Sequence, residues 1–168
     1  MVNKNYFTVI FSMVLTTGNT LRCSNPDPIK TFSEKTCVEN GRKWFQIGGS
    51  KPCENCCIYR NMTQISDRHL AITDTVIKDD ETQVFNYNVV RDENASIYYS
   101  ESISEGIIML DTDCNKYAII YDSNTNDLQV FSKLRNLNAT FVNTLDGIKQ
   151  CNLPIYDYGT EEACQKII

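Results

Sequence analysis

Several residue types and patterns are scarce or missing in this chain of 168 residues. The single histidine, His69, excludes any catalytic or metal-binding group that needs two histidines. Lysine and arginine form no basic stripe and the net charge is −5, so we expect neither nucleic acid nor an anionic membrane as a partner. No apolar run reaches the roughly 20 residues of a membrane-spanning helix, so we expect no stable membrane anchor. Internal repeats and low-complexity tracts are also missing, which favours a single domain.

The first 20 residues have the order of a secretory signal peptide. Lys4 supplies a positive charge, an apolar run follows over residues 6–15, and small residues fill positions 16–20. This order predicts that residues 1–20 are removed and that residues 21–168 form a secreted, extracellular protein.

Eight cysteines follow that segment, and an even number in a secreted chain favours disulfides over free thiols. The alternative is a zinc site at Cys53 and Cys56, but zinc sites need further ligands at a suitable spacing, and we expect no metal and no cofactor. Three glycosylation sequons are present, at Asn61, Asn94 and Asn138.

Short β-branched and aromatic runs separated by polar clusters predict eight strands, at 44–48, 57–65, 69–77, 82–91, 95–102, 106–110, 116–122 and 128–134. Connections this short pair neighbouring strands in an antiparallel meander, which forms a sandwich or a barrel. A closed barrel of eight strands leaves room inside for side chains or for one small ligand. Beyond the strands, Phe141, Leu145 and Ile148 share one helical face, which predicts a single helix over 139–151.

Three motifs in this order resemble those of the lipocalins. The segment GRKWFQI carries the first-strand tryptophan at Trp44, although Gly41 lies one residue further upstream than in the family. The segment DTDCNKYAIIY carries Thr112 and Asp113 of the threonine-aspartate-tyrosine corner, with Cys114 in place of the tyrosine. The third motif is an arginine after the last strand, and Arg135 matches it.

The resemblance is to the branch of apolipoprotein D and the insect bilin-binding proteins, or to the secreted salivary lipocalins of arthropods. It extends to an arm at 21–32 and to a terminal helix and tail in 139–158. It implies an all-β fold: an eight-stranded antiparallel up-and-down barrel over 42–135, with one C-terminal α-helix over 139–151 packed on the barrel. A tail over 152–168 would be tied down by a disulfide.

The resemblance also implies roles for the motif residues at the closed end of the barrel, which we call the floor. Arg135 would pack over the ring of Trp44, and Thr112 and Asp113 would bind backbone groups at the corner. It implies a disulfide from Cys23 to Cys114 and another from Cys56 or Cys57 to Cys164, with Cys57 preferred. The remaining pairs would form among Cys37, Cys53, Cys56 and Cys151.

A secreted cup of this kind carries or scavenges a small hydrophobic or amphipathic ligand, such as a lipid, pigment, odorant or biogenic amine. Strand alternation does not say which face lines the cup. The lining residues we select are Asp74, Tyr87, Ile97, Tyr99, Met109, Ile119 and Tyr121, and Asp74 would be the carboxylate for an amine. The alternative is an extracellular inhibitor that acts through surface loops of a filled barrel. An enzyme is not expected. The lipocalins that isomerise peroxides need a free thiol, and the even number of cysteines argues against one. The oligomeric state stays open.

Overall fold

An antiparallel sheet that curls onto itself accounts for most of the chain. The structure, a computed structural model, describes residues 23, 26–30, 34–38, 43–54, 56–79, 81–93, 96–100, 103–134, 145–158 and 164. Its eight barrel strands are β1 (Trp44–Gly49), β2 (Cys56–Ser66), β3 (His69–Lys78), β4 (Glu81–Arg91), β5 (Ile97–Ser100), β6 (Ile103–Thr112), β7 (Tyr117–Asp122) and β8 (Asp127–Ser132). Each strand predicted from the sequence is present, with bounds that differ by a few residues.

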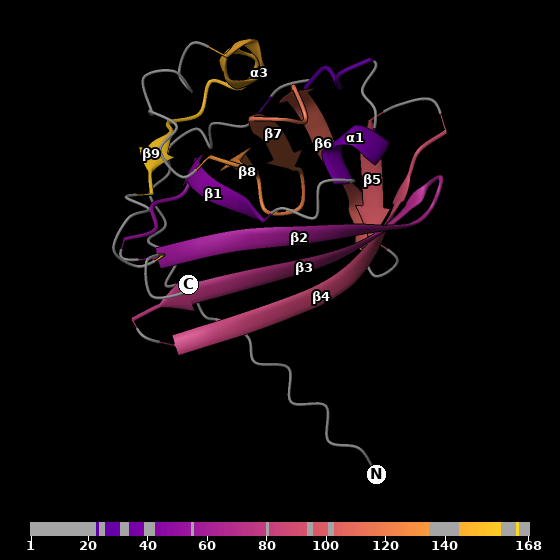
Figure 1. Cartoon of the computed structure of the whole chain (residues 1–168). Helices are drawn as coiled ribbons and strands as arrows, with labels where there is room; N and C mark the ends of the chain where they lie inside the picture. Colours follow the sequence, from indigo (N-terminus) through magenta and orange to yellow (C-terminus); the bar gives the residue numbers. More distant parts are fainter. Residues whose placement is uncertain are drawn as a thin grey trace.

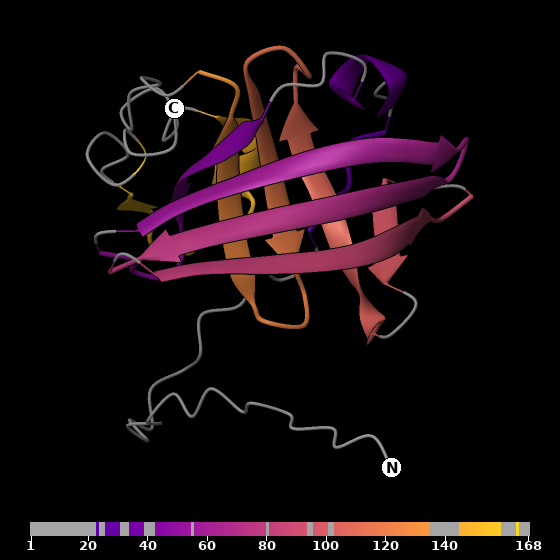
Figure 2. The same cartoon turned by 60° about the horizontal axis from the view of Figure 1, so that its bottom comes forward.

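The strands form an up-and-down barrel, as predicted. Each strand from β2 to β8 pairs with the next, and β1 closes the barrel by pairing with both β8 and β2. Phe45 is the residue at which both pairings meet, opposite Ser132 on one side and Tyr59 on the other. In Figure 2 the long strands β2, β3 and β4 cross the front of the molecule and the remaining strands lie behind them; Figure 1 shows the same three strands along its lower side.

Alternation along the strands separates two apolar clusters. On β7, Ala118 and Ile120 belong to the cluster inside the barrel, together with Trp44 and Phe131. The intervening Ile119 belongs to a second cluster on the outside of the barrel, which the tail and a short helix cover. The interior and the outer cluster are therefore built from opposite faces of the same strands.

Within the described residues, three short elements lie outside the barrel: α1 (Glu34–Val38), α3 (Asp146–Lys149) and β9 (Tyr156–Asp157), which pairs with β1. Helix α3 lies within the predicted helix but spans only four residues; residues 135–144 are outside the described part. Gly147 lets α3 approach β6 closely, since an added Cβ would lie 2.8 Å from the Cβ of Asp111. Neither described helix has the length and apolar character needed to cross a membrane.

All eight cysteines form disulfides, in the pairs Cys23–Cys151, Cys37–Cys114, Cys53–Cys56 and Cys57–Cys164. The Cys57–Cys164 pair is the one expected. The predicted Cys23–Cys114 pair is wrong. Helix α1, which the sequence did not predict, brings Cys37 to the corner at Cys114, and Cys23 instead reaches Cys151 just after α3.

Candidate ligand-binding cavity

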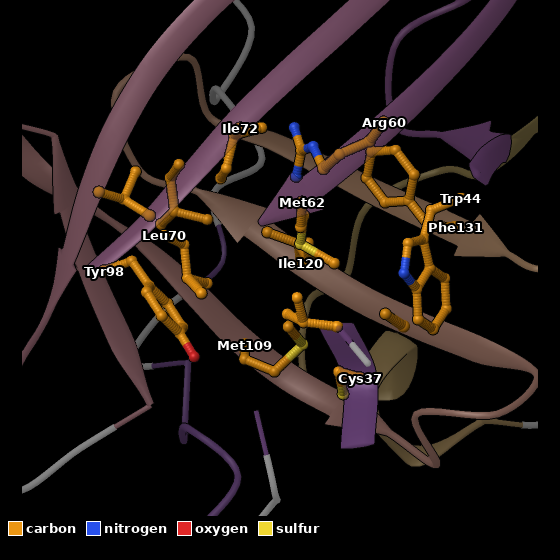
Figure 3. A pocket seen from close by; sticks show the side chains of 14 residues that line it. Cys37, Trp44, Arg60, Met62, Leu70, Ile72, Tyr98, Met109, Ile120 and Phe131 are labelled. Atoms are coloured by element: carbon orange, nitrogen blue, oxygen red, sulfur yellow. The ribbon is translucent and has the colours of Figure 1, made fainter. Parts of the chain in front are cut away.

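The inward faces of the strands enclose a cavity lined almost entirely by apolar side chains. The apolar side chains that line it include Met62, Leu70, Ile72, Val89, Met109 and Ile120, most of which are labelled in Figure 3. The volume that the centre of a water molecule can occupy is about 40 Å³, which is room for a few waters, since one needs about 10–15 Å³. The volume of the cavity is small, but Met62 and Met109, which line it, have flexible side chains that can adapt to a guest.

Helix α1 and the N-terminal arm cover one end of this cavity. Cys37 and Val38 of α1 line it directly. The backbone N–H of Ile29 donates to the carbonyl of Met109 at 2.9 Å, and the hydroxyl of Ser96 donates to the carbonyl of Ile29 at 2.7 Å. The arm is therefore fixed across β5 and β6, and this end is the floor.

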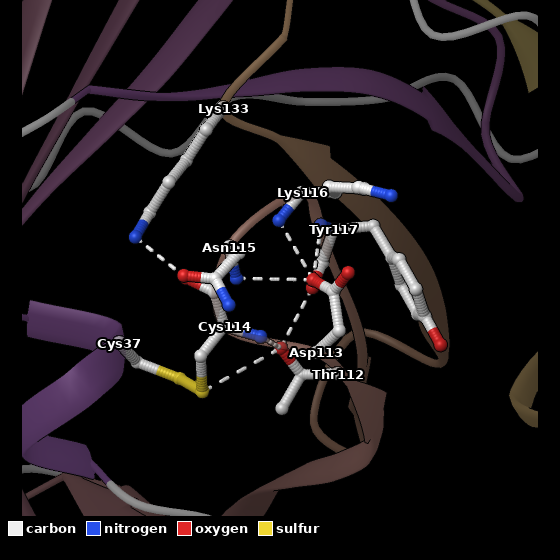
Figure 4. The surroundings of a disulfide bond; sticks show 8 residues. All are labelled: Cys37, Thr112, Asp113, Cys114, Asn115, Lys116, Tyr117 and Lys133. Atoms are coloured by element: carbon white, nitrogen blue, oxygen red, sulfur yellow. Dashed lines mark hydrogen bonds between the residues drawn. A yellow bond between two sulfur atoms is a disulfide. The ribbon is translucent and has the colours of Figure 1, made fainter.

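The corner between β6 and β7 is held by the side chains of Thr112 and Asp113 (Figure 4). Thr112 Oγ1 donates to the carbonyl of Tyr117 at 2.6 Å and accepts from the N–H of Cys114 at 2.9 Å. One carboxylate oxygen of Asp113 accepts from three backbone N–H groups, those of residues 115, 116 and 117. Both residues thus fix the floor through backbone groups, in the roles that the resemblance implied, and neither lines the cavity.

A lysine packs over the tryptophan of the floor. The Nζ atom of Lys133 lies 4.6 Å from the centroid of the Trp44 ring, whose residue is 2% exposed. The same Nζ donates to the carbonyl of Cys114 at 2.6 Å, so it joins the first strand to the corner (Figure 4). Arg135, predicted to pack on Trp44, lies outside the described residues.

The one charged side chain among the described residues that line the cavity is Arg60, on β2. Its Nε and Nη2 atoms donate to the two carboxylate oxygens of Asp74 at 2.7 and 2.8 Å. Tyr87 donates to Asp74 at 2.8 Å and accepts from Arg60 Nη2 at 3.1 Å. The guanidinium carbon also lies 4.5 Å from the centroid of Phe131.

The ionisation of this cluster follows from its burial. Burial alone would lower the pKa of Arg60, but Tyr87 and Asp74 outweigh it, and the pKa lies above its ordinary value. Burial raises the pKa of Tyr87, and the nearby carboxylate of Asp74 adds to the rise while Arg60 opposes it. Arg60 is therefore a permanent cation and Tyr87 a neutral hydroxyl at physiological pH.

Seven residues were predicted to line the cavity. The structure places three of them on the inward face of the strands and four on the outward face. Met109 lines the cavity. Asp74 and Tyr87 do not line it themselves but form hydrogen bonds with Arg60, which does. The other four are on the outside: Ile97, Tyr99, Ile119 and Tyr121. Their selection was wrong because the strand phase is opposite to the one assumed, so that Tyr98, Ala118 and Ile120 face inward instead.

Arg60 was missed, although it stands between Ile58 and Met62 in an alternating strand. Of the sequons, Asn61 lies on the outer face of β2, because its neighbours Arg60 and Met62 line the cavity. Asn94 and Asn138 lie outside the described residues. Within the described chain, no three His, Cys, Asp or Glu side chains gather as metal ligands do.

Of the comparisons with known proteins, only the one with solved structures finds a likeness, and it shows the fold alone. No family model matches the sequence, and no curated protein matches it either. The structure is similar to 218 solved chains, so the fold by itself does not name a ligand. One of them is the siderocalin Ex-FABP, described as functioning through dual ligand specificities. It is 13% identical, with a TM-score of 0.60 over 74% of this chain and 97% of its own. The chain has a lipocalin-like fold.

Proposed function

We propose that this protein is an extracellular carrier or scavenger that binds a small, mostly hydrophobic molecule inside the barrel. The observation that carries the proposal is the cavity inside the barrel, whose described lining holds one charged side chain, the paired Arg60, and is otherwise mainly apolar. Such a site gains free energy by removing apolar surface from water and orients its guest with a few polar groups. The four disulfides support the extracellular setting, because such bonds persist in oxidising compartments.

The contacts of Asp74 narrow the range of ligands expected from the sequence. A biogenic amine needs a carboxylate that is free to pair with its ammonium group. Both oxygens of Asp74 already accept from Arg60. Lipids, pigments and odorants therefore fit the cavity better than amines do.

A second function is favoured by one observation, the small volume of the cavity. A barrel that stays filled would leave the surface loops as the working part, as in an inhibitor of another extracellular protein. An enzyme that uses a cysteine thiol has no support, since all eight cysteines are in disulfides.

Native mass spectrometry of the protein purified from its source tests the proposal. We expect a complex heavier than the chain by the mass of one small molecule, which organic extraction removes. The extracted protein should then take up an apolar fluorescent probe. The variant Ala118→Phe fills the cavity and should abolish uptake, whereas Asn88→Phe, which adds the same ring at an exposed site, should not. A bare chain that takes up no probe would favour the loop-mediated alternative.

A further inference from the structure

The positive charge of Arg60 and the negative charge of Asp74 neutralise each other at the wall of the cavity. Arg60 and Asp74 make a two-pronged ion pair, with side chains that are 6% and 16% exposed. Both carboxylate oxygens accept from the guanidinium, and the hydroxyl of Tyr87 adds a further hydrogen bond to Asp74. Asp122 is another acid whose charge acts on Arg60, but its carboxylate accepts from backbone N–H groups of the β7–β8 turn. A guest in the cavity therefore meets a neutral wall.

A neutral wall disfavours a charged guest of either sign. A ligand carboxylate placed against Arg60 would also stand beside Asp74, and a ligand ammonium placed against Asp74 would stand beside Arg60. Each would lose its hydration without gaining an unpaired counter-charge, and burying a charge on those terms is costly. A neutral molecule does not incur this cost.

The guanidinium of Arg60 keeps the two N–H groups of Nη1 outside the ion pair. Within the described chain, the hydrogen bonds of the guanidinium leave from Nε and Nη2, and Nη1 makes none. The polar atoms of the cluster contribute almost nothing to the surface of the cavity, so a guest meets this wall chiefly through apolar contact. The remaining lining offers apolar contact for a chain or ring (Figure 3).

The direction of the cavity fits a guest with one polar end. Exposure rises along the inward face of β4, from Val89 at 1%, through the half-buried Tyr87, to Phe85 at 51%. The polar cluster thus lies between the apolar interior and solvent. A polar group bound there leaves the apolar part of the guest to fill the deeper end.

We propose that the Arg60–Asp74–Tyr87 cluster makes the cavity select small, electrically neutral molecules with an uncharged polar group at one end. An alcohol, aldehyde, ketone or ester on an apolar chain belongs to this class; the acid and the amine of the same length do not. The inference rests on the proposed function, because it assumes that the cavity takes a guest. It also predicts that the cavity will favour an anionic ligand when Asp74 loses its carboxylate, and a cationic ligand when Arg60 loses its guanidinium.

Calorimetric titration with decan-1-ol, decanoate and decylammonium at pH 7.5 tests this selection. In the wild-type protein the alcohol should bind at least about tenfold more tightly than either ion. A tenfold ratio of affinities corresponds to about 1.4 kcal/mol of binding free energy. Asp74→Asn leaves Arg60 without its carboxylate, so decanoate should gain about tenfold or more over its wild-type affinity. Arg60→Gln leaves Asp74 without its cation, so decylammonium should gain in the same way.

The exposed ion pair between Arg68 and Glu93, at 2.7 Å, supplies matched controls. Arg68→Gln and Glu93→Gln make the same kinds of change on the surface and should leave the order of the three ligands unaltered. Circular dichroism establishes which variants fold, and since the two interior variants predict opposite preferences, either one alone is informative. If neither folds, the wild-type series decides.

Two failures can be told apart. If the wild-type protein binds decanoate or decylammonium as tightly as decan-1-ol, the selection for neutral ligands is wrong although the cavity does bind guests. The same holds if both interior variants change all three affinities equally. If the wild-type protein binds none of the three and takes up no apolar probe, the proposed function fails and the inference falls with it.

Discussion

The ammonium group of Lys133 lies 4.6 Å from the centroid of the Trp44 ring while it donates a hydrogen bond to the carbonyl of Cys114. This lysine therefore links the first strand to the corner between β6 and β7. Cys114 has a positive φ of 60° and is also bonded to Cys37 of α1. Four parts of the chain thus meet at one end of the barrel: α1, β1, the β6–β7 corner and the residue that follows β8. Their contacts stabilise this end.

Removing the cation from this contact should weaken the fold. Lys133→Met keeps the length of the side chain but loses both the cation–π contact and the hydrogen bond to Cys114, at a cost of about 2 kcal/mol in unfolding free energy. Urea denaturation measures the change. Lys116→Met removes an exposed lysine from the same corner and should cost much less. Equal losses for the two variants would contradict the role given to Lys133.

Truncating the ring itself should cost more. Trp44 is 2% exposed, and replacing a buried aromatic side chain by alanine typically costs about 3–5 kcal/mol. Trp44→Ala should therefore lower the melting temperature well below that of Tyr99→Ala, which truncates a ring that is 38% exposed. An unchanged melting temperature for Trp44→Ala would show that the tryptophan is not part of the core.

The disulfides should differ in what they contribute. In the chain-entropy model the stabilisation grows with the loop closed, and it gives about 4 kcal/mol for Cys37–Cys114 and about 2 kcal/mol for Cys53–Cys56. The two bonds join residues that are 77 and 3 positions apart. Replacing each pair by serines and measuring unfolding in guanidinium checks the order. A larger loss for the Cys53–Cys56 pair would contradict it.

Alkaline pH should destabilise the protein through the partly buried Tyr117 and the buried Tyr158. Burial and the nearby Asp111 raise the pKa of Tyr117 to about 12, and burial and Asp127 raise the pKa of Tyr158 to about 12. The folded state thus favours the neutral phenol, whereas the unfolded state loses the proton near pH 10. The stabilisation is present below pH 10 and is lost as the pH rises through about 12.

Unfolding free energies measured from pH 8 to 12 check this dependence. The wild-type curve should fall above pH 10, and Tyr117→Phe together with Tyr158→Phe should make the fall shallower. A curve of the same slope in the double variant would show that other groups cause the loss.

The fold was predictable because it depends on patterns that the sequence shows directly. The period of the strands and the short breaks between them gave the meander, and Trp44, Thr112 and Asp113 placed it among lipocalin-like barrels. The lining was not predictable, because a shift of one residue exchanges the two faces of a strand. On β5 and β7 the predicted face was the wrong one, and the structure places Ile97, Tyr99, Ile119 and Tyr121 on the outside of the barrel.

The ion pair between Arg60 and Asp74 could not be predicted from the sequence either. A two-residue turn at Asp67 and Arg68 pairs Ser66 with His69, and continued regularly it would set Arg60 opposite Thr75. An irregularity between Gln64 and Ser66 shifts the register, so that Arg60 faces Asp74 instead. A bulge of this kind leaves no clear mark in the sequence. Helix α1 is likewise too short to show a periodic signal, and with it the Cys37–Cys114 bond was missed.

Trp44 is the only tryptophan of the chain and it lines the cavity, so its fluorescence reports on the barrel interior alone. The most direct measurement is therefore a titration of the purified, delipidated protein with decan-1-ol, followed by this emission. The proposed function predicts a saturable change with one site per chain that disappears in Ala118→Phe. Emission that does not respond, or that responds equally in Ala118→Phe, would contradict binding inside the barrel.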